Sequence, residues 1–268
     1  MTSLVNFLEG NRASILVTVT GTKGSTPREE GAFMLVSEAR CFGTIGGGAL
    51  EFMAIDNARA QLKGSGQTQM DVPLGPEIGQ CCGGRTILTF QQVTPDVASD
   101  LESRLAAESA AFPRVTLFGA GHVGKALAAA LLPLPFQVTV VETRREELEG
   151  LPNGVETKHV AMPEALVKDL PRASAVLILT HDHALDFLIA KEALARSDLA
   201  YIGMIGSQTK RATFKNWLAR ETSGEVSEER LILPVGGTKV RDKRPAVIAA
   251  LVAAELLTIC ASILTSPD

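Results

Sequence analysis

The chain has 268 residues, of which 46% are hydrophobic and 21% are charged, and its formal net charge at pH 7 is −4. This length fits two modest domains or one large one, and the apolar content is sufficient for a full core, which excludes a disordered tail and a disulfide-stapled miniprotein. The mild acidity argues against a nucleic-acid partner, because neutralising phosphates requires clustered lysine and arginine side chains.

The first half of the chain predicts a mixed α/β domain over residues 1–112. Apolar and β-branched runs predict strands over residues 14–20, 32–36 and 86–90. The spacing of apolar residues predicts helices over residues 49–62 and 95–110. We place the domain boundary near Phe112 and Pro113, ahead of a more regular pattern.

The second half, residues 113–268, alternates strands and helices. The predicted strands cover residues 115–118, 137–141, 175–180 and 200–202. The predicted helices cover residues 122–132, 184–196, 208–220 and 245–264. This alternation predicts a Rossmann-like, doubly wound parallel sheet covered by helices on both faces, so the fold class is α/β.

The sequence lacks the signals of a membrane or exported protein. No apolar stretch reaches the ~18 uncharged residues of a membrane span, and the nearest, residues 245–264, contains Glu255. The first residues do not form the basic start, apolar core and cleavage site of an export signal. Four cysteines, two of them adjacent, do not form a disulfide framework. We therefore expect a cytoplasmic protein with no membrane partner.

A glycine-rich turn of the dinucleotide-binding type lies between a predicted strand and a predicted helix. In the sequence GAGHVG, Gly119 permits a tight turn, Gly121 lets a pyrophosphate approach the backbone, and Gly124 lets helix and strand pack closely. His122 lies within this turn. Glu142 ends the next strand, 18 residues after Gly124, near the ~20-residue offset at which an acid contacts a ribose hydroxyl. We expect these five residues to bind a nucleotide or dinucleotide.

Two alternatives stay open at this turn. The fold can serve as scaffold with its crevice empty or used by another ligand, since fold does not fix function. Arg144 and Arg145 follow Glu142 and could hold a phosphate, which leaves the preference for NAD undecided.

A second candidate anion site lies in the first domain. Gly46, Gly47 and Gly48 precede a predicted helix, whose first amides are free to bind an anion. The loop ahead of it supplies hydroxyl and guanidinium donors, from Ser25, Thr26 and Arg28. The alternative is a turn that needs glycine for its backbone angles alone.

The adjacent cysteines form the most informative segment. Gln80, Cys81, Cys82 and Gly83 lie in a glycine-rich loop, where a thiol of lowered pKa would be reactive or would face a metal. The alternative for Cys81 and Cys82 is small buried hydrophobic side chains, which is the preferred interpretation for Cys41 and Cys260. A closed structural metal site needs more ligands than this spacing provides.

A polar cluster follows the strand predicted over residues 175–180. His181, Asp182 and His183 are expected to face the same crevice as the glycine turn, because the carboxyl ends of parallel strands line it. They could titrate, bind a metal or hold a substrate oxygen, or Asp182 could simply cap the following helix. Ser207 caps the next predicted helix and faces the same edge.

Five blocks of the chain together resemble the XdhC/CoxI family, the xanthine dehydrogenase accessory proteins. They are GTIGGGALE, IGQCCGGR, LFGAGHVGKAL, LTHDHALD and YIGMIGSQTKR. The resemblance implies an N-terminal XdhC/CoxI domain and a C-terminal Rossmann domain. It also implies a chaperone that binds molybdenum cofactor, supports its sulfuration with a cysteine desulfurase, and delivers it to apo-xanthine dehydrogenase.

The resemblance also implies which residues contact the cofactor. Cys81 and Cys82 become the candidate thiols near molybdenum, and the loops at residues 25–28 and 46–48 become candidate phosphate and pterin contacts. The segment from Lys239 to Arg244 departs from the family, because it is basic where members usually have a glycine-leucine-aspartate stretch and an acidic helix start.

Two other functions compete with the chaperone. The glycine turn with Glu142 and the histidine cluster suits an NAD(P)-dependent oxidoreductase, although the first domain offers no clear acid–base pair. A sulfur-relay protein that carries persulfide on Cys81 or Cys82 is the other. A homo-oligomer is expected if the alanine-rich terminal helix presents its apolar face to a second copy.

Overall fold

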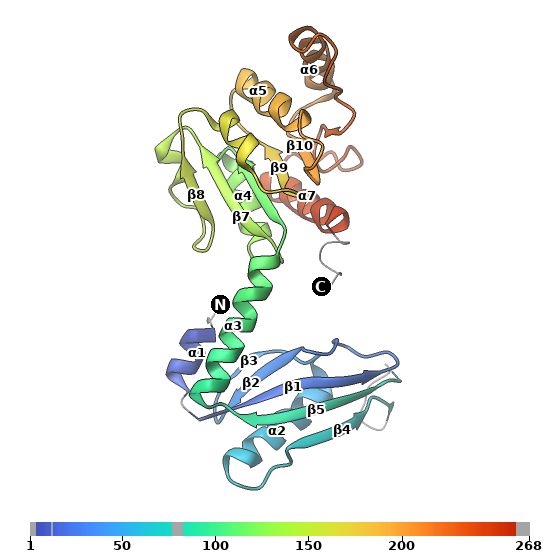
Figure 1. The fold of residues 1–268 in the computed structure, drawn as a ribbon. Coiled ribbons are helices and arrows are strands. Elements are labelled where there is room, and N and C mark those ends of the chain that lie inside the picture. The colour runs from blue at the N-terminus through green and yellow to red at the C-terminus, as the bar shows by residue number, and fades with distance from the viewer. Residues whose placement is uncertain (1–3, 12, 77–82, 261–268) are drawn as a thin grey trace. The chain divides into compact units, whose positions relative to one another are not determined.

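The computed structural model describes residues 4–11, 13–76 and 83–260, and divides into two compact units. The first comprises residues 1–106 and the second residues 107–268. The division falls within helix α3 (Pro95–Ala111), the green helix of Figure 1.

The N-terminal unit contains an antiparallel sheet in the order β3-β2-β1-β5-β4. Its strands are β1 (Ser14–Lys23), β2 (Phe33–Ser37), β3 (Cys41–Gly43), β4 (Gln69–Pro73) and β5 (Arg85–Gln92). The central strand β1 carries apolar side chains on both faces, because Ile15, Val17 and Val19 join one hydrophobic cluster and Leu16 another.

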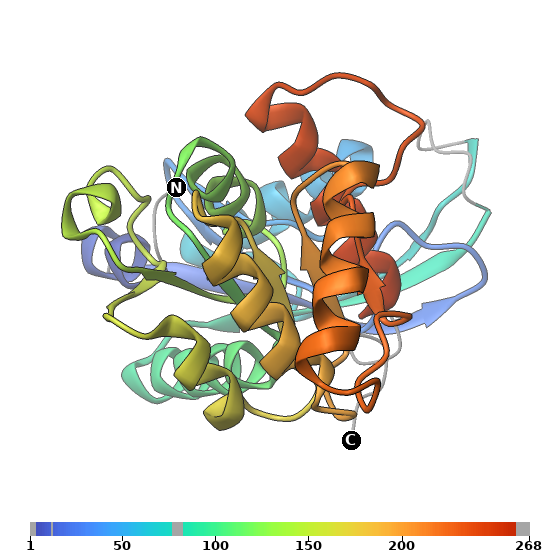
Figure 2. The same ribbon diagram turned by 90° about the horizontal axis from the view of Figure 1, so that it is seen from above.

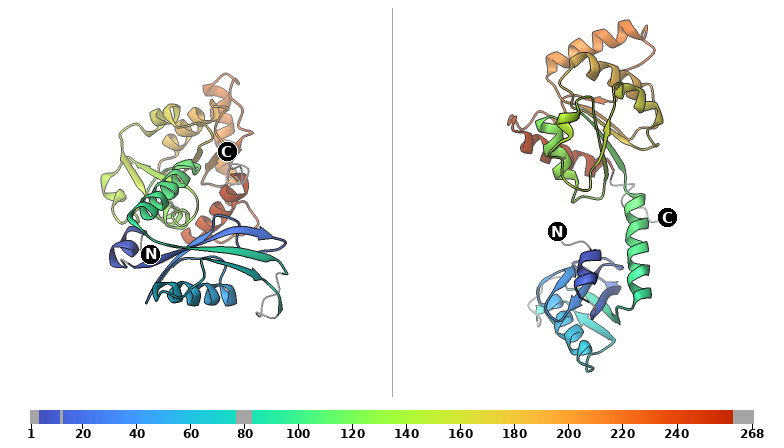
Figure 3. Two further views of the ribbon diagram at one scale, coloured as in Figure 1. Left: turned by 60° about the horizontal axis from the view of Figure 1, so that its bottom comes forward. Right: turned by 90° about the vertical axis from the view of Figure 1, so that its left-hand side faces the viewer.

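Helices cover both faces of this sheet. Helix α2 (Gly48–Leu62) packs Leu50, Ala54 and Ala58 into the cluster that contains Val17. The left view of Figure 3 shows this helix along one face of the sheet. On the other face, α1 (Leu4–Gly10) and α3 contribute Phe7 and Leu101. Helix α1 and strands β3 and β4 lack a clear signal in the sequence and were not predicted.

The C-terminal unit contains a parallel sheet in the order β11-β10-β9-β6-β7-β8. Its strands are β6 (Arg114–Phe118), β7 (Gln137–Glu142), β8 (Glu156–His159), β9 (Ala175–Ile178), β10 (Tyr201–Met204) and β11 (Leu231–Ile232). The order reverses between β6 and β9, so this is the doubly wound Rossmann arrangement, and the predicted fold class is confirmed.

Helices cover both faces of the parallel sheet as well. On one face lie α4 (His122–Leu131) and α7 (Pro245–Ile259), which share a cluster with Leu117 and Leu177. On the other lie α5 (His183–Leu194) and α6 (Gln208–Glu221), seen side by side in Figure 2. Two 3₁₀ helices complete the unit, η2 (Arg145–Leu148) and η3 (Pro163–Asp169).

The terminal helix is shorter than predicted within the described residues. It was expected to reach residue 264, but α7 ends at Ile259 and Cys260 is its C-cap; residues 261–264 lie outside the described part. Cys260 is buried in the cluster beneath it, as predicted, whereas Cys41 is exposed, so its prediction as a buried hydrophobe is wrong. Cys41 lies on β3, the edge strand of its sheet, which has a neighbouring strand on one side only.

Candidate cofactor-binding sites

Close glycine packing brings the predicted loops of the N-terminal unit together. A Cβ on Gly46 would lie 2.5 Å from the Pro27 ring, and a Cβ on Gly84 would overlap the carbonyl oxygen of Ser25. These contacts leave no space for a side chain, so glycine is required for the approach. The loop at residues 25–28 therefore lies against both the triple-glycine loop and the segment that begins at Gly83.

Two other glycines in these loops face open space. Gly47 and Gly83 have positive φ values of 78° and 68°, and no heavy atom of the described residues lies within 4 Å of an added Cβ at either. Gln80, Cys81 and Cys82, including the predicted metal-proximal thiols, lie outside the described residues. The described neighbours thus combine backbone that packs inward with backbone that is open to a ligand.

The amides of the triple-glycine loop already bind an anion that belongs to the chain. The Glu51 carboxylate accepts hydrogen bonds from the amides of Ile45 at 2.9 Å and Gly46 at 3.3 Å, and from the Thr44 hydroxyl. Partial burial raises the pKa of Glu51, but the Thr44 hydroxyl and the loop amides outweigh it and lower the pKa. The predicted anion-binding arrangement of backbone amides is present, and the Glu51 carboxylate already accepts hydrogen bonds from some of these amides.

The polar side chains of the neighbouring loop remain available. Ser25 and Arg28 are exposed and Thr26 is half-buried. Among the described residues, no hydrogen bond or ion pair holds the Arg28 guanidinium. Phe52, in the first turns of α2, is 70% exposed and adds an aromatic surface to the same helix start.

The three glycines of the dinucleotide-type turn in the C-terminal unit have different surroundings. Gly119, at φ 116°, packs against β9, since an added Cβ would lie 2.5 Å from the Leu179 carbonyl oxygen. A Cβ on Gly124 would overlap the Gly119 carbonyl oxygen, which fixes α4 close to its strand. Gly121, the N-cap of α4, has open space around its Cβ position. A ligand can therefore approach the backbone at Gly121.

Glu142 differs from the ribose-binding acid that the sequence predicted. Its side chain is 4% exposed, and Oε2 accepts a 2.8 Å hydrogen bond from the Ala120 amide within the turn itself. Oε1 accepts from the amides of Thr143 and Arg144. Burial raises the pKa of Glu142, but the Ala120 amide and the Arg144 guanidinium outweigh it and lower the pKa. The Glu142 carboxylate therefore stabilises the glycine turn through its hydrogen bond with the Ala120 amide.

The histidine cluster lies beside the glycine turn, because Gly119 packs directly on Leu179 and Thr180. Asp182 is the N-cap of α5, and its side chain accepts hydrogen bonds from the amides of Ala184 and Leu185. This geometry is the helix cap that the sequence offered as an alternative. His122, His181 and His183 are all exposed, so their predicted roles stay predictions.

Sequence reasoning missed the most buried ion pair of the described residues. Lys210 donates to the Asp186 carboxylate, whose side chain is 0% exposed, and to the Ile205 carbonyl oxygen at 3.0 Å. Thr180 also donates to Asp186, at 2.6 Å. Ser207 caps α6 by accepting from the Lys210 amide, as predicted. The only signal in the sequence was a charged side chain in the first turn after each helix cap, four residues after Asp182 and three after Ser207.

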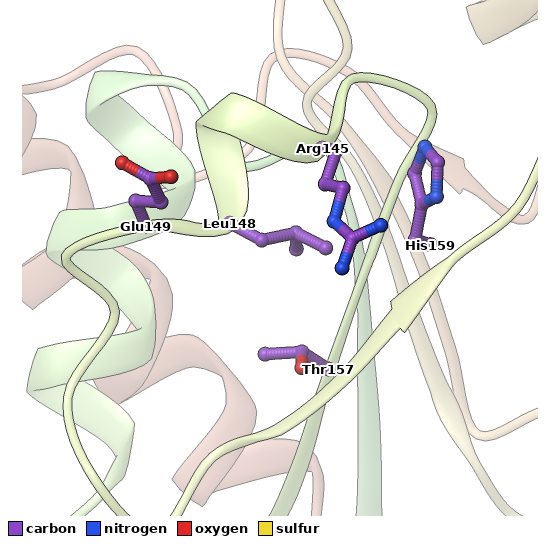
Figure 4. A pocket seen from close by; sticks show the side chains of 5 residues that line it. All are labelled: Arg145, Leu148, Glu149, Thr157 and His159. Atoms are coloured by element: carbon purple, nitrogen blue, oxygen red, sulfur yellow. The ribbon is translucent and has the colours of Figure 1, made fainter.

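A hollow of about 500 Å³ lies between η2 and β8, close to the end of β7. Figure 4 shows the five side chains that line it: Arg145, Leu148, Glu149, Thr157 and His159. In this view Arg145 and His159 lie next to each other, and Glu149 points away from the Arg145 guanidinium.

Three further properties bear on these sites. Across residues 4–11, 13–76 and 83–260, no three histidine, cysteine or acidic side chains are grouped so that they could hold a metal ion. In the same residues, no helix is both long and apolar enough to cross a membrane. In the basic segment that departs from the family, Arg244 pairs with Asp242 at 2.6 Å, while Lys239, Arg241 and Lys243 are exposed.

Two family models match the chain. One, described as the XdhC Rossmann domain, covers residues 115–256, and the other, described as the XdhC and CoxI family, covers residues 7–72. A crystal structure described as a xanthine dehydrogenase from Bacillus halodurans has a similar fold, with a TM-score of 0.78. It is 20% identical in sequence, and the match covers 99% of this chain and 98% of that one.

A curated relative is longer than this chain. The uncharacterized protein YqeB of Escherichia coli strain K12 is 27% identical over 259 residues. The match covers 94% of this chain and 44% of YqeB, so the chain spans less than half of that relative's length.

Proposed function

The chain belongs to the XdhC family, and from this premise we propose that it is an accessory protein for the maturation of xanthine dehydrogenase. In this proposal it binds molybdenum cofactor, protects it, supports its sulfuration and delivers it to the apo-enzyme, without catalysing a reaction of its own. Its partners would be apo-xanthine dehydrogenase, a cysteine desulfurase and a second copy of itself.

The convergence of the three predicted loops in the N-terminal unit carries this proposal. Gly46 and Gly84 pack on the loop at residues 25–28, while Gly47 and Gly83 leave their faces open. Glycines with open space beside an exposed guanidinium fit an anionic pterin, because the glycines allow close approach and the cation can hold its phosphate. Cys81 and Cys82 directly precede Gly83 in the sequence, and a thiolate is a soft ligand suited to molybdenum.

Different parts of the N-terminal unit would contact different parts of the molybdenum cofactor. Arg28, which no described residue neutralises, would pair with the phosphate, and the ligand would lie against Gly47 and Gly83, where the missing side chains leave open space. The cofactor itself supplies the molybdenum centre that the recipient enzyme uses. Glu51 keeps the triple-glycine loop in shape, because its carboxylate holds the amides of Ile45 and Gly46.

The test measures the pterin bound after the full chain is incubated anaerobically with molybdenum cofactor. We expect near-stoichiometric pterin in the wild type and about tenfold weaker retention for Arg28→Ala, which removes one charge-assisted contact. Arg40→Ala is the matched control, because Arg40 is exposed in the turn between β2 and β3, at the far end of that hairpin from the triple glycine. The absence of pterin from both wild type and Cys82→Ala would end the proposal.

Sulfur relay through Cys81 or Cys82 is a separate proposal. It requires a persulfide on one thiol after incubation with a desulfurase and cysteine. Intact-mass measurement would show the added sulfur, and an unchanged mass would eliminate the role.

A nucleotide in the C-terminal unit is proposed as a second ligand, on the observation that Gly121 faces open space between two tightly packed glycines. An anion there would meet free amides and the positive end of the α4 dipole. Whether such a ligand serves redox chemistry, as in an NAD(P)-dependent oxidoreductase, depends first on its binding. Titration with NADH and NADPH tests this, and no fluorescence change at millimolar ligand would remove it.

A further inference from the structure

The carboxyl end of β7 offers a free cation where a nucleotide-binding turn usually offers a free acid. Glu142, the acid at this position, is 4% exposed, and both of its oxygens already accept backbone hydrogen bonds. A ribose hydroxyl that reached this edge would find no unoccupied carboxylate oxygen. A free carboxylate at this position usually selects an unphosphorylated ribose, but the Glu142 carboxylate is engaged in hydrogen bonds within the protein.

Two consecutive arginines follow Glu142, and the structure gives them different roles. Arg144 is held by Glu142 and by Glu147, at 3.4 Å each, so its charge is compensated internally. Arg145 is exposed, and no described residue forms an ion pair or a hydrogen bond with its guanidinium. Of these two arginines, Arg145 is the one whose positive charge no described residue compensates.

Arg145 extends into the hollow described above, between η2 and β8 (Figure 4). Thr157 supplies a hydroxyl, and His159 also lines the hollow, with Nε2 3.1 Å from the Thr143 carbonyl oxygen. On β8 the side chains alternate, so the pair Glu156 and Lys158 belongs to a different hollow. The volume of about 500 Å³ is sufficient for a ribose phosphate.

We infer that this hollow binds the 2′-phosphate of a dinucleotide of the NADP(H) class, with Arg145 as its principal contact. The pyrophosphate would lie at Gly121 and the ribose phosphate at the ends of β7 and β8, all at the carboxyl edge of the parallel sheet. The inference rests on the proposal that the C-terminal unit binds a dinucleotide. It is independent of the molybdenum cofactor proposal.

Calorimetric titration of the full chain with NADPH and with NADH tests the assignment. We expect NADPH to bind at least ~10-fold more tightly, because a hydrogen-bonded charge pair is worth about that factor. Arg145→Ala should weaken NADPH binding by about tenfold, leave NADH binding unchanged, and lose most of the discrimination, while Arg145→Lys should retain part of it.

Arg172→Ala is the matched control. It removes the same charge from a side chain that is 89% exposed, in the segment before β9 and thus at the opposite edge of the sheet. Fluorescence of Trp217, the single tryptophan, shows whether each variant retains its fold. Competition between 2′,5′-ADP and 3′,5′-ADP identifies the phosphorylated hydroxyl.

Three results would overturn the assignment: equal affinity for NADH and NADPH, equal behaviour of the Arg145→Ala and Arg172→Ala variants, or tighter binding of 3′,5′-ADP than of 2′,5′-ADP. Binding of neither dinucleotide would instead refute the dinucleotide proposal as a whole. The pterin measurement would be unaffected by either outcome, so the failures can be told apart.

Discussion

At the scale of single residues, the pair of Asp186 and Lys210 joins the ends of two neighbouring strands. Asp186 accepts from Thr180, just after β9, and Lys210 donates to the Ile205 carbonyl oxygen, just after β10. Their side chains are 0% and 8% exposed. Two loops at the carboxyl edge of the sheet are thereby tied to helices α5 and α6.

Removal of one partner of this pair leaves an uncompensated buried charge. We expect Lys210→Met and Asp186→Ala each to lower the free energy of unfolding of the C-terminal unit by about 3–5 kcal/mol. Urea denaturation followed by Trp217 fluorescence measures this. The control is Arg244→Ala, which breaks an ion pair whose arginine is 78% exposed and should leave the free energy of unfolding nearly unchanged, because water screens exposed pairs. Equal effects of the buried and exposed substitutions would contradict the argument.

Glu142 makes the stability of the same unit depend on pH. Its pKa is lowered in the fold, so its stabilising contribution is complete above the ordinary value of 4.5 and is lost as the pH falls through the lowered, folded-state pKa. We expect Glu142→Gln to reduce the free energy of unfolding by about 1–3 kcal/mol at neutral pH and to flatten the acid limb of its pH profile. An unchanged acid limb would refute the assignment.

At the scale of secondary-structure elements, the contact between α4 and β6 depends on glycine in a position-specific way. A Cβ at Gly124 would overlap the Gly119 carbonyl oxygen, whereas Gly121 is an N-cap with open space around it. We expect Gly124→Ala to destabilise the unit by roughly 1–3 kcal/mol through overpacking. Gly121→Ser should change the free energy of unfolding by under ~0.5 kcal/mol, because serine is a favoured N-cap. The same substitution should block dinucleotide binding, because its side chain would fill the open space at Gly121. Urea denaturation and an NADPH titration of both variants separate packing from binding.

Helix α5 provides a test of what the histidine–aspartate cluster does. Asp182 caps the helix through hydrogen bonds to the Ala184 and Leu185 amides, at 2.8 and 3.4 Å. We expect Asp182→Ala to cost about 0.5–2 kcal/mol of unfolding free energy, and Asp182→Ser to restore most of it. His181→Ala is the neighbouring control and should leave stability unchanged. A loss of ligand binding in Asp182→Ser at full stability would show a role beyond capping.

At the scale of the whole molecule, each unit builds its own core. The clusters around Val17 and Leu16 contain residues only from the N-terminal unit, and those around Leu117 and Phe118 only from the C-terminal unit. We expect a fragment of residues 107–268 to fold alone and to show the Trp217 unfolding midpoint of the full chain, because its apolar burial is internal. A fragment without a cooperative transition would contradict this.

The architecture was largely predictable because its buried strands are apolar and β-branched. The strands predicted over residues 14–20, 115–118 and 175–180 are all confirmed, as is the alternation that produces the parallel sheet. The missed strands lack this signal. Strand β8 consists of Glu156, Thr157, Lys158 and His159, all exposed, so only pairing with β7 makes it a strand.

The family was also accessible from the sequence, because its five blocks carry residue types at fixed spacings, and the two family models confirm that resemblance. In the GAGHVG turn, the structure agrees with a tight turn at Gly119 and close packing at Gly124, since each role follows from the absence of a Cβ. The approach of a pyrophosphate at Gly121 stays a prediction. Such properties are local, and neighbouring residues along the chain suffice to specify them.

The tertiary structure alone decided which groups fill the anion sites. Glu142 and Ala120 are 22 positions apart in the sequence, and Asp186 and Lys210 are 24 positions apart. No local sequence pattern therefore predicts either contact. The same holds for the free charge of Arg145, which differs from Arg144 only in what the fold places beside it. Side-chain type is written in the sequence, but the availability of a charge depends on burial and partners, and these exist only once distant segments have packed together.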